Sequence, residues 1–199
     1  MARARAKART TRGESVLGER FAVFAECLLT GVWIAVACLG VVTYPAAFAA
    51  GARHLRRRTT HRGGGLPEFV RDFRTALRGG WIVGLAGWAV AGAVWVDVLA
   101  ARAGLPGGPF AGAVGVFALI GAAVALLRAA AVWAPGTSWR ASLADAGRRT
   151  VLDPAGSFLI VCGLAVVALS AGFVPPLAVP VLGAAAAAAV AVEERHRHR

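Results

Sequence analysis

A run of 39 residues, 154–192, contains no charged side chain, and this run restricts the possible folds of the chain more than any other feature. A membrane-spanning helix needs about 20 mainly apolar residues, because the hydrocarbon core of a bilayer is about 30 Å thick. The run is therefore too long for one crossing. It is interrupted at 174–176, Val-Pro-Pro, where proline removes a backbone donor and disfavours helix in the residue before it. We expect two spans, at 155–173 and 177–192.

Further apolar stretches of membrane-spanning length precede this run. They lie at 21–42, 81–101 and 110–133. The turn at 105–109, Leu-Pro-Gly-Gly-Pro, joins the last two into a hairpin. After the first stretch, apolar residues continue past Pro45 into a group of arginines, which predicts a short, tilted span at 45–58 whose arginines reach the membrane surface. The sequence thus predicts an all-α membrane protein, a bundle of six transmembrane helices in three hairpins, with a single membrane domain at 21–192.

The composition supports this fold class. Hydrophobic residues make up 58% of the chain and charged residues only 16%, whereas charged residues are about a quarter of an ordinary soluble domain. The net charge of +12 also occurs in nucleic-acid-binding proteins, but these spread their basic residues over a folded surface, and here the basic residues lie between apolar runs. We therefore expect a lipid bilayer, with anionic lipid at its cytoplasmic face, and no nucleic acid as partner.

The positions of the basic residues predict the orientation, because Lys and Arg accumulate on the cytoplasmic side of a membrane. With six crossings, 20 of the 22 Lys and Arg residues fall in cytoplasmic segments. Of the other two, Arg102 lies on the outer side and Arg128 lies within a span. We expect a multi-pass protein of the bacterial inner (plasma) membrane with both termini in the cytoplasm, as basic tails at 1–20 and 193–199.

Two segments that precede predicted spans have the pattern of amphipathic helices at a membrane surface. In 66–78, Phe69, Phe73 and Leu77 recur every four residues and charged residues fill the other face of the helix. Before the fifth span, Trp139 and Leu143 repeat this spacing. We expect both segments to be cytoplasmic lead-in helices that dock Phe69, Phe73, Trp139 and Leu143 in the interface or against the bundle. One hypothesis is a threefold repeat of lead-in helix and hairpin, and a chance similarity explains the pattern equally well.

Three short motifs stand in the first half of the chain. They are Trp33, the run Leu-Gly-Val-Val-Thr-Tyr-Pro-Ala-Ala at 39–47, and the aromatic and basic helix Phe-Val-Arg-Asp-Phe-Arg at 69–74. Together they resemble the YesL-like family of small bacterial integral membrane proteins, whose function is uncharacterised. The resemblance implies a six-helix membrane protein that is often encoded beside carbohydrate-uptake transporters and sugar hydrolases. It implies no catalytic or binding residue.

Residues with metal-binding or nucleophilic chemistry form no recognisable pattern. The four histidines lie in basic flanking segments, and the three cysteines lie inside apolar stretches without a Cys-x-x-Cys pair. The chain has neither a phosphate-binding loop nor a nucleophile elbow. We therefore expect no catalytic residue, no metal site and no cofactor, and we do not expect an enzyme.

Three ionisable residues within the predicted spans are candidates for function, because such residues are costly in a membrane. They are Glu26, Arg128 and Asp97. Glu26 and Arg128 lie at similar distances from the cytoplasmic side, about 9 Å and about 8 Å. We expect them to pair, and snorkelling of the arginine to the surface is the alternative. Asp97 lies near the outer end of its span, where it reaches water or Arg102.

Trp81, Trp88 and Trp95 follow one another at intervals of seven residues, which places them on one stripe of the third span. A stacking platform for a sugar ring is one interpretation. The better explanation is that they belong to the interfacial aromatic belt or pack against lipid or a neighbouring helix.

These observations lead to three hypotheses about function. The first is an auxiliary membrane component without catalytic chemistry, associated with carbohydrate uptake, that acts through its cytoplasmic helices on a transporter or another membrane protein. The second is a small-solute transporter or permease in its own right, which needs a polar pathway through the spans. The third is a protein that binds anionic lipid through its basic cytoplasmic face.

Overall fold

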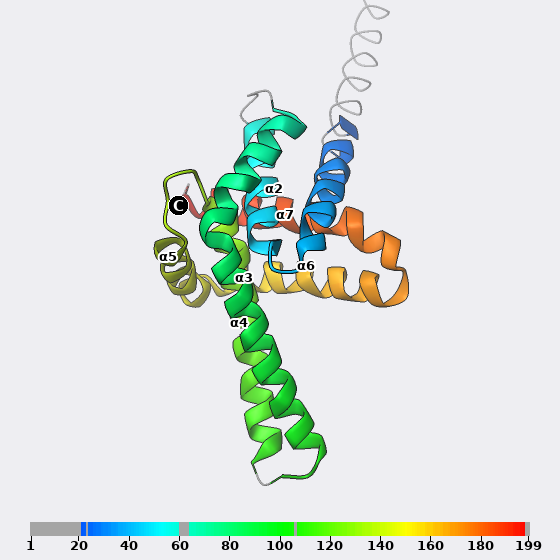
Figure 1. The fold of residues 1–199 in the computed structure, drawn as a ribbon, viewed down its shortest axis with the longest axis vertical. Helices are drawn as coiled ribbons and strands as arrows, with labels where there is room; N and C mark the ends of the chain where they lie inside the picture. The colour runs from blue at the N-terminus through cyan, green and yellow to red at the C-terminus, as the bar shows by residue number, and fades with distance from the viewer. Residues whose placement is uncertain (1–20, 23, 60–63, 106, 198–199) are drawn as a thin grey trace, which may run out of the picture.

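The computed structural model describes residues 21–22, 24–59, 64–105 and 107–197 (Figure 1). Within these ranges the secondary structure is helical and contains no strand, so the predicted all-α class is confirmed. An N-terminal helix, Phe24–Gly40, ends in the short 3-10 helix η1 (Cys38–Gly40). The helices that follow are α2 (Tyr44–Thr59), α3 (Leu66–Arg102), α4 (Gly108–Val132), α5 (Trp139–Leu152), α6 (Pro154–Phe173) and α7 (Pro175–Arg197).

The helices α3, α4 and α6 are long and apolar enough to cross a membrane. The mean hydropathies of their most apolar segments are 1.9, 2.4 and 2.2, and no more than 17% of any of these segments is buried inside the protein. Apolar surface of this extent is stable only in an apolar solvent. These helices therefore fit the membrane protein that the sequence predicts.

The predicted lead-in helix 66–78 and the predicted span 81–101 are one continuous helix, α3, of 37 residues. Glu68 caps its start by accepting a hydrogen bond from the Gly65 N–H at 2.9 Å. Two adjacent glycines near its middle do not interrupt it, because the ring of Trp139 packs against them. Tertiary packing thus overrides the low helix propensity of glycine, and the separate lead-in helix is a wrong prediction.

The predicted second span, 45–58, is the helix α2, but it is not among the helices long and apolar enough to cross a membrane. It packs against α3, α4, α7 and the N-terminal helix. Small residues make this close packing possible, and the buried ones are Ala46, Ala47, Ala49, Ala50, Gly51 and Ala52. A helix surrounded by protein in this way has little face left for lipid, so the structure does not support a second span here.

The second predicted lead-in helix is the separate helix α5. The Ser138 hydroxyl caps its start by accepting a hydrogen bond from the Ala141 N–H at 3.2 Å. After α5, the helices α6 and α7 form a hairpin that turns at Val174, where the two prolines predict a break. The limits of α4 and α6 agree within two residues with the predicted 110–133 and 155–173.

The two apolar hairpins run in different directions. In Figure 1, α3 and α4 lie side by side along the longest axis, whereas α6 and α7 run across it. The two hairpins and α2 share a core to which α2, α4, α6 and α7 contribute. Its buried residues are Ala52, Val124, Leu127, Ala131, Ile160, Ala189, Val190 and Val192. The structure therefore does not support the predicted arrangement of six spans and three hairpins in one bundle.

Candidate functional site

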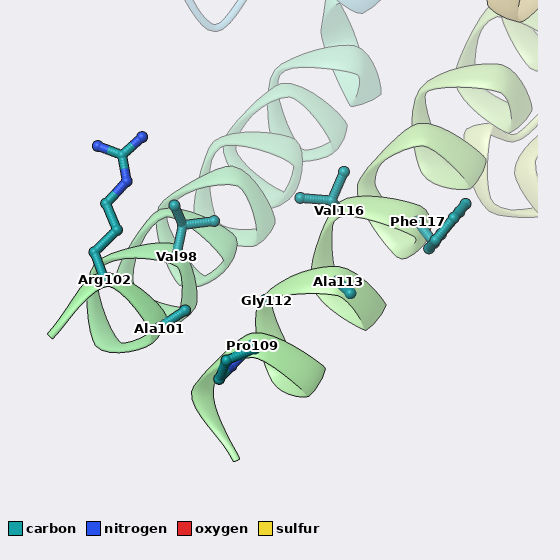
Figure 2. Close-up of a pocket in the computed structure, with 8 residues that line it drawn as sticks. All are labelled: Val98, Ala101, Arg102, Pro109, Gly112, Ala113, Val116 and Phe117. Carbon is teal, nitrogen blue, oxygen red and sulfur yellow. The ribbon is translucent and has the colours of Figure 1, made fainter. Parts of the chain in front are cut away.

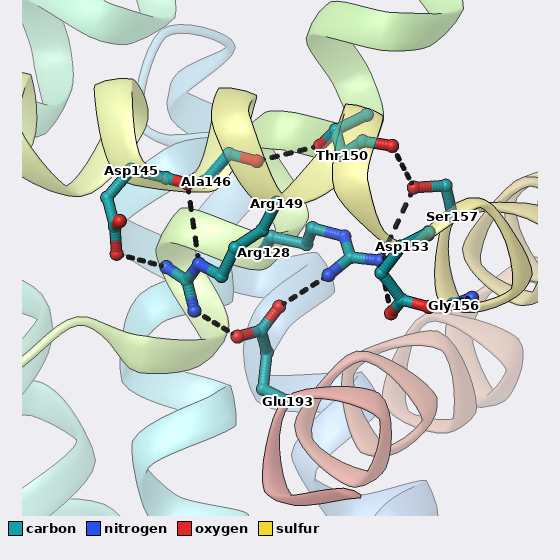
Figure 3. A network of polar contacts seen from close by, with 9 residues as sticks. All are labelled: Arg128, Asp145, Ala146, Arg149, Thr150, Asp153, Gly156, Ser157 and Glu193. Carbon is teal, nitrogen blue, oxygen red and sulfur yellow. Dashed lines mark hydrogen bonds and ion pairs between the residues drawn. The ribbon is translucent and has the colours of Figure 1, made fainter. Parts of the chain in front are cut away.

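Arg128, on α4, is fully buried, and its guanidinium group is the centre of a network of ion pairs (Figure 3). Its Nη1 donates to Glu193 Oε1 at 3.1 Å. Its Nη2 donates to Asp153 Oδ2 at 3.0 Å and to Ser157 Oγ at 3.3 Å. Because a buried charge is costly unless it is paired and hydrogen-bonded, these contacts make the position of Arg128 tolerable.

Glu193, near the end of α7, joins two arginines (Figure 3). One carboxylate oxygen binds Arg128, and the other accepts a hydrogen bond from Arg149 of α5. Arg149 also pairs with Asp145 one helical turn earlier, at 3.0 Å. The Glu193 side chain is only 3% exposed. The network therefore ties α4, α5 and α7 to the start of α6.

Asp153 shapes the junction between α5 and α6. Its Oδ1 accepts a hydrogen bond from the Gly156 N–H at 3.1 Å and so caps α6, while its Oδ2 binds Arg128. A Cβ atom at Gly156 would lie 2.1 Å from Asp153 Oδ2 and 2.7 Å from Arg128 Nη2. The Ser157 hydroxyl donates to the Thr150 carbonyl at 2.8 Å. Only glycine at 156 leaves room for this arrangement.

A second charged group joins the N-terminal helix to α2. Glu26 Oε1 lies 2.7 Å from His54 Nε2 and 2.9 Å from Arg58 Nε. His54 is fully buried, and its ring meets the edge of Trp33 with 5.0 Å between the ring centroids. Glu26 thus holds two residues of α2 that lie one turn apart.

A third charged group joins α2 to α3. Asp72 Oδ2 lies 3.2 Å from Arg53 Nε and 2.8 Å from Arg57 Nη2, and the Asp72 side chain is buried. Burial lowers the pKa of the Arg53 guanidinium, and the Asp72 carboxylate opposes this change. The next arginine, Arg56, donates to the Trp133 carbonyl at 2.6 Å and so connects α2 to the end of α4.

The predicted pair of Glu26 and Arg128 is wrong, because each residue has other partners. Glu26 binds α2, whereas Arg128 binds the α5–α6 junction and α7. Similar depth in a membrane does not determine which helix faces which. The alternative, snorkelling of Arg128 to the surface, is also wrong, since the side chain is fully buried.

Sequence reasoning missed the acidic partners of Arg128. Asp153 and Glu193 are the residues immediately before and after the uncharged run 154–192. Charged residues in such positions usually remain in water, so the sequence alone predicts no buried partner there. Their position at the two ends of one apolar run is the signal that could have found them, because a hairpin brings its two ends together. His54 and Asp72 carried no comparable signal.

Asp97 lies on α3 where this helix faces α4. Its carboxylate is half-buried and lies close to Gly115 of α4. Among the described residues, no hydrogen bond or ion pair of the Asp97 side chain is found, including any with Arg102. The predicted contact with Arg102 is therefore not found.

Trp81, Trp88 and Trp95 are exposed on the surface of α3, with 49%, 52% and 63% of their area accessible. The Trp88 Nε1–H donates to the Val41 carbonyl at 3.0 Å, in the turn before α2. The positions of Trp81 and Trp95 on the apolar face of α3 favour contact with lipid.

The four predicted docking residues face the protein. Phe69 is buried and stacks on Phe73, with 6.5 Å between the ring centroids. Trp139 is also buried, and its Nε1–H donates to the Ala76 carbonyl at 2.9 Å. Leu143 is half-buried beside α3 and α4. These side chains pack α3 and α5 against the rest of the chain.

Two hollows in the described part of the chain lie along the α3–α4 hairpin, and both are lined mainly by apolar residues. One, of about 430 Å³, lies near the connection between the helices, and Arg102 is the charged residue among those that line it (Figure 2). The other, of about 270 Å³, is bordered by Tyr44 and Leu143. Neither hollow is lined by Arg128, Glu26 or their partners.

The charged groups inside the protein bind one another and so hold helices together. Among the described residues, no group of three or more His, Cys, Asp or Glu side chains is placed to hold a metal ion. Comparison with protein families, curated proteins and solved structures finds no match to this chain. The resemblance to the YesL-like family therefore stays a prediction.

Proposed function

We propose that the chain is a multi-pass protein of the bacterial inner membrane with both termini in the cytoplasm. The apolar surfaces of α3, α4 and α6 support the membrane location. The distribution of arginines supports the orientation, because the segment that connects α3 to α4 is bordered by Arg102 alone, while the opposite ends of these helices adjoin many arginines.

Within the membrane, the protein acts as an auxiliary component without catalytic chemistry, associated with carbohydrate uptake. The observation that carries this proposal is a set of exposed arginines on α3 and α5. Their side chains are exposed and have no hydrogen-bond or ion-pair partner within the described residues: Arg71, Arg74, Arg78, Arg140 and Arg148. Arg149 of α5 and the arginines of α2 are used inside the protein, so these five are available to a partner. The link to carbohydrate uptake comes from the resemblance to the YesL-like family.

The test is co-purification from mild detergent. Replacement of Arg71, Arg74 and Arg78 by Gln removes three exposed charges of α3 and leaves the internal ion pairs in place. We expect subunits of a carbohydrate-uptake transporter to co-purify with the wild-type protein and to be depleted with the triple variant, as measured by quantitative mass spectrometry.

Arg102→Gln is the matched control, because it removes an arginine from the other end of the same helix. It should retain the partner. The proposed role fails if no uptake transporter is enriched over an unrelated membrane protein, or if the triple variant and the control retain it equally.

Binding of anionic lipid is a second candidate, favoured by the position of Arg71, Arg74 and Arg78 directly before the exposed Trp81. A Lys or Arg near an anionic surface contributes about 1 kcal/mol. Lipid that binds the folded state raises the unfolding temperature. We expect phosphatidylglycerol to raise it more than phosphatidylcholine in the wild type and in Arg102→Gln, and equally little in the triple variant. Equal effects of both lipids on the wild type would exclude this candidate.

A further inference from the structure

The length of the apolar exposed face of α3 matches the thickness of the hydrocarbon core of a membrane. Its first turns expose Arg71, Arg74 and Arg78. From Trp81 to Leu99 it exposes large apolar residues: Trp81, Ile82, Leu85, Trp88, Val90, Trp95, Val96 and Leu99. These 18 steps correspond to about 27 Å of helix, close to the thickness of a hydrocarbon core of about 30 Å. The boundary of the hydrocarbon on the arginine-rich side therefore lies between Arg78 and Trp81.

The first hairpin, formed by the N-terminal helix and α2 (residues 24–59), turns beside Trp88. The Trp88 indole donates to the Val41 carbonyl at 3.0 Å. A Cβ at Gly84 would lie 2.0 Å from the Val42 carbonyl oxygen, so the turn lies directly on α3. Trp88 is seven residues beyond Trp81, which is about 10 Å into the hydrocarbon. In Figure 1 the hairpin likewise ends beside the middle of α3, far from the connection to α4.

The open end of the same hairpin lies on the polar side of the boundary. Arg53 and Arg57 of α2 pair with Asp72. Asp72 precedes Trp81 by nine residues, which corresponds to about 14 Å outside the hydrocarbon. Arg58 follows in α2 and pairs with Glu26 of the N-terminal helix. The start of the N-terminal helix and the end of α2 therefore both lie among charged groups on the arginine-rich side.

The outer face of the N-terminal helix is apolar. Leu29, Val32, Val36 and Leu39 recur at helical spacing and are exposed, with Leu39 at 79%. Thr30 and Ile34, on the other face, are fully buried. The apolar stripe runs from near Glu26 to the turn, so it covers the part of the hairpin that enters the hydrocarbon.

Backbone polar groups at the turn have hydrogen-bond partners within the protein, as an apolar environment requires. Non-helical backbone at membrane depth needs partners for its polar groups, because lipid tails offer none. Two backbone carbonyls at the turn accept hydrogen bonds from side chains. The Val41 carbonyl accepts one from the Trp88 indole, and the Ala37 carbonyl accepts one from the Thr43 hydroxyl. Val41 itself has a φ of +56° and its N–H donates to the Cys38 carbonyl at 2.9 Å.

We propose that the first hairpin is re-entrant: it enters the leaflet on the arginine-rich side, turns beside Trp88 and returns to the same side. The stripe Leu29, Val32, Val36 and Leu39 contacts the acyl chains of that leaflet alone. In this arrangement, the predicted spans 21–42 and 45–58 do not cross the membrane. Because two crossings are removed together, both termini still lie on the same side. It does not depend on the proposed auxiliary function, because it concerns contact with lipid only.

Cysteine accessibility tests this proposal. Cys27, Cys38 and Cys162 are replaced by Ala, and single cysteines are placed in the full-length chain at Val41, at Leu105 near the α3–α4 connection, and at Arg140 on α5. A membrane-impermeant maleimide is applied to right-side-out and to inside-out membrane vesicles. We expect V41C to be unlabelled in both preparations and labelled after detergent is added, L105C to be labelled from one side only, and R140C from the other side only.

Labelling of V41C from the same side as L105C would show a full crossing, and labelling from the same side as R140C would show a hairpin outside the membrane. Either result overturns the proposal. A fluorophore at L39C provides an independent measurement. Nitroxide lipids labelled along the acyl chain should quench it strongly when placed in the leaflet next to Arg140 and weakly when placed in the opposite leaflet. Equal quenching from both leaflets also overturns it.

Discussion

At the scale of single residues, Arg128 and its acidic partners show how ion pairs allow a charged side chain to be buried. Arg128 is fully buried and is paired with two carboxylates, those of Asp153 and Glu193, and a second arginine, Arg149, also binds Glu193. Removal of one member of such a group leaves its partner buried and uncompensated, which is why a single substitution costs more than the pair contributes.

We expect Arg128→Met to lower the free energy of unfolding by about 3–5 kcal/mol, because Glu193 and Asp153 lose their ion pairs with Arg128. Adding Glu193→Gln should cost less than the sum of the two single changes. Unfolding in detergent measures both. Combination of Arg128→Met with Glu26→Gln is the control and should be additive; coupling in this second cycle would mean that Glu26 and Arg128 meet after all.

Gly156→Ala should lower the free energy of unfolding by about 1–3 kcal/mol, because the added Cβ overlaps Asp153 and Arg128. Gly163→Ala is a matched control on the same helix, since a Cβ there meets no atom within 4 Å. Alanine favours helix over glycine, so the control should be neutral or stabilising. Equal effects of the two changes would show that the space at Gly156 is not restricted.

At the scale of helices, local patterns predicted the existence of most elements but not their continuity. The two prolines after Val174 mark a true helix end, because the chemistry of proline acts on its own neighbours. The predicted boundary between 66–78 and 81–101 falls at Gly79 and Gly80, but α3 is continuous there, where Trp139 packs against both glycines. A contact that comes from a residue far along the chain leaves no trace in a local pattern.

Trp139→Ala should destabilise the protein by about 3–5 kcal/mol, because a large buried ring and its hydrogen bond to Ala76 are lost from the contact between α5 and α3. Trp95→Ala is the control, since this ring is exposed. Unfolding temperatures in detergent compare the two variants. A control as unstable as Trp139→Ala would contradict the docking of α5 through this ring.

At the scale of the whole molecule, the orientation in the membrane follows from the positions of the arginines. Reporter fusions after Arg140 should report the cytoplasm, and fusions within 105–109 should report the outside, because Lys and Arg stay on the cytoplasmic side. A cytoplasmic signal from 105–109 would reverse the whole arrangement. This measurement is separate from the test of the re-entrant hairpin, which compares Val41 with both sides.

The sequence by itself determined that the chain is helical and apolar enough for a membrane, and where α4, α5 and α6 lie. These properties depend on the length of apolar runs and on proline and charge patterns, which act over a few residues. The tertiary structure alone decided that α2 is packed inside the protein, that the two apolar hairpins run in different directions, and that Arg128 binds Asp153 and Glu193 while Glu26 binds His54 and Arg58. The physical reason is that ion pairs and close packing depend on which helix faces meet, and residues distant in the sequence determine those faces together.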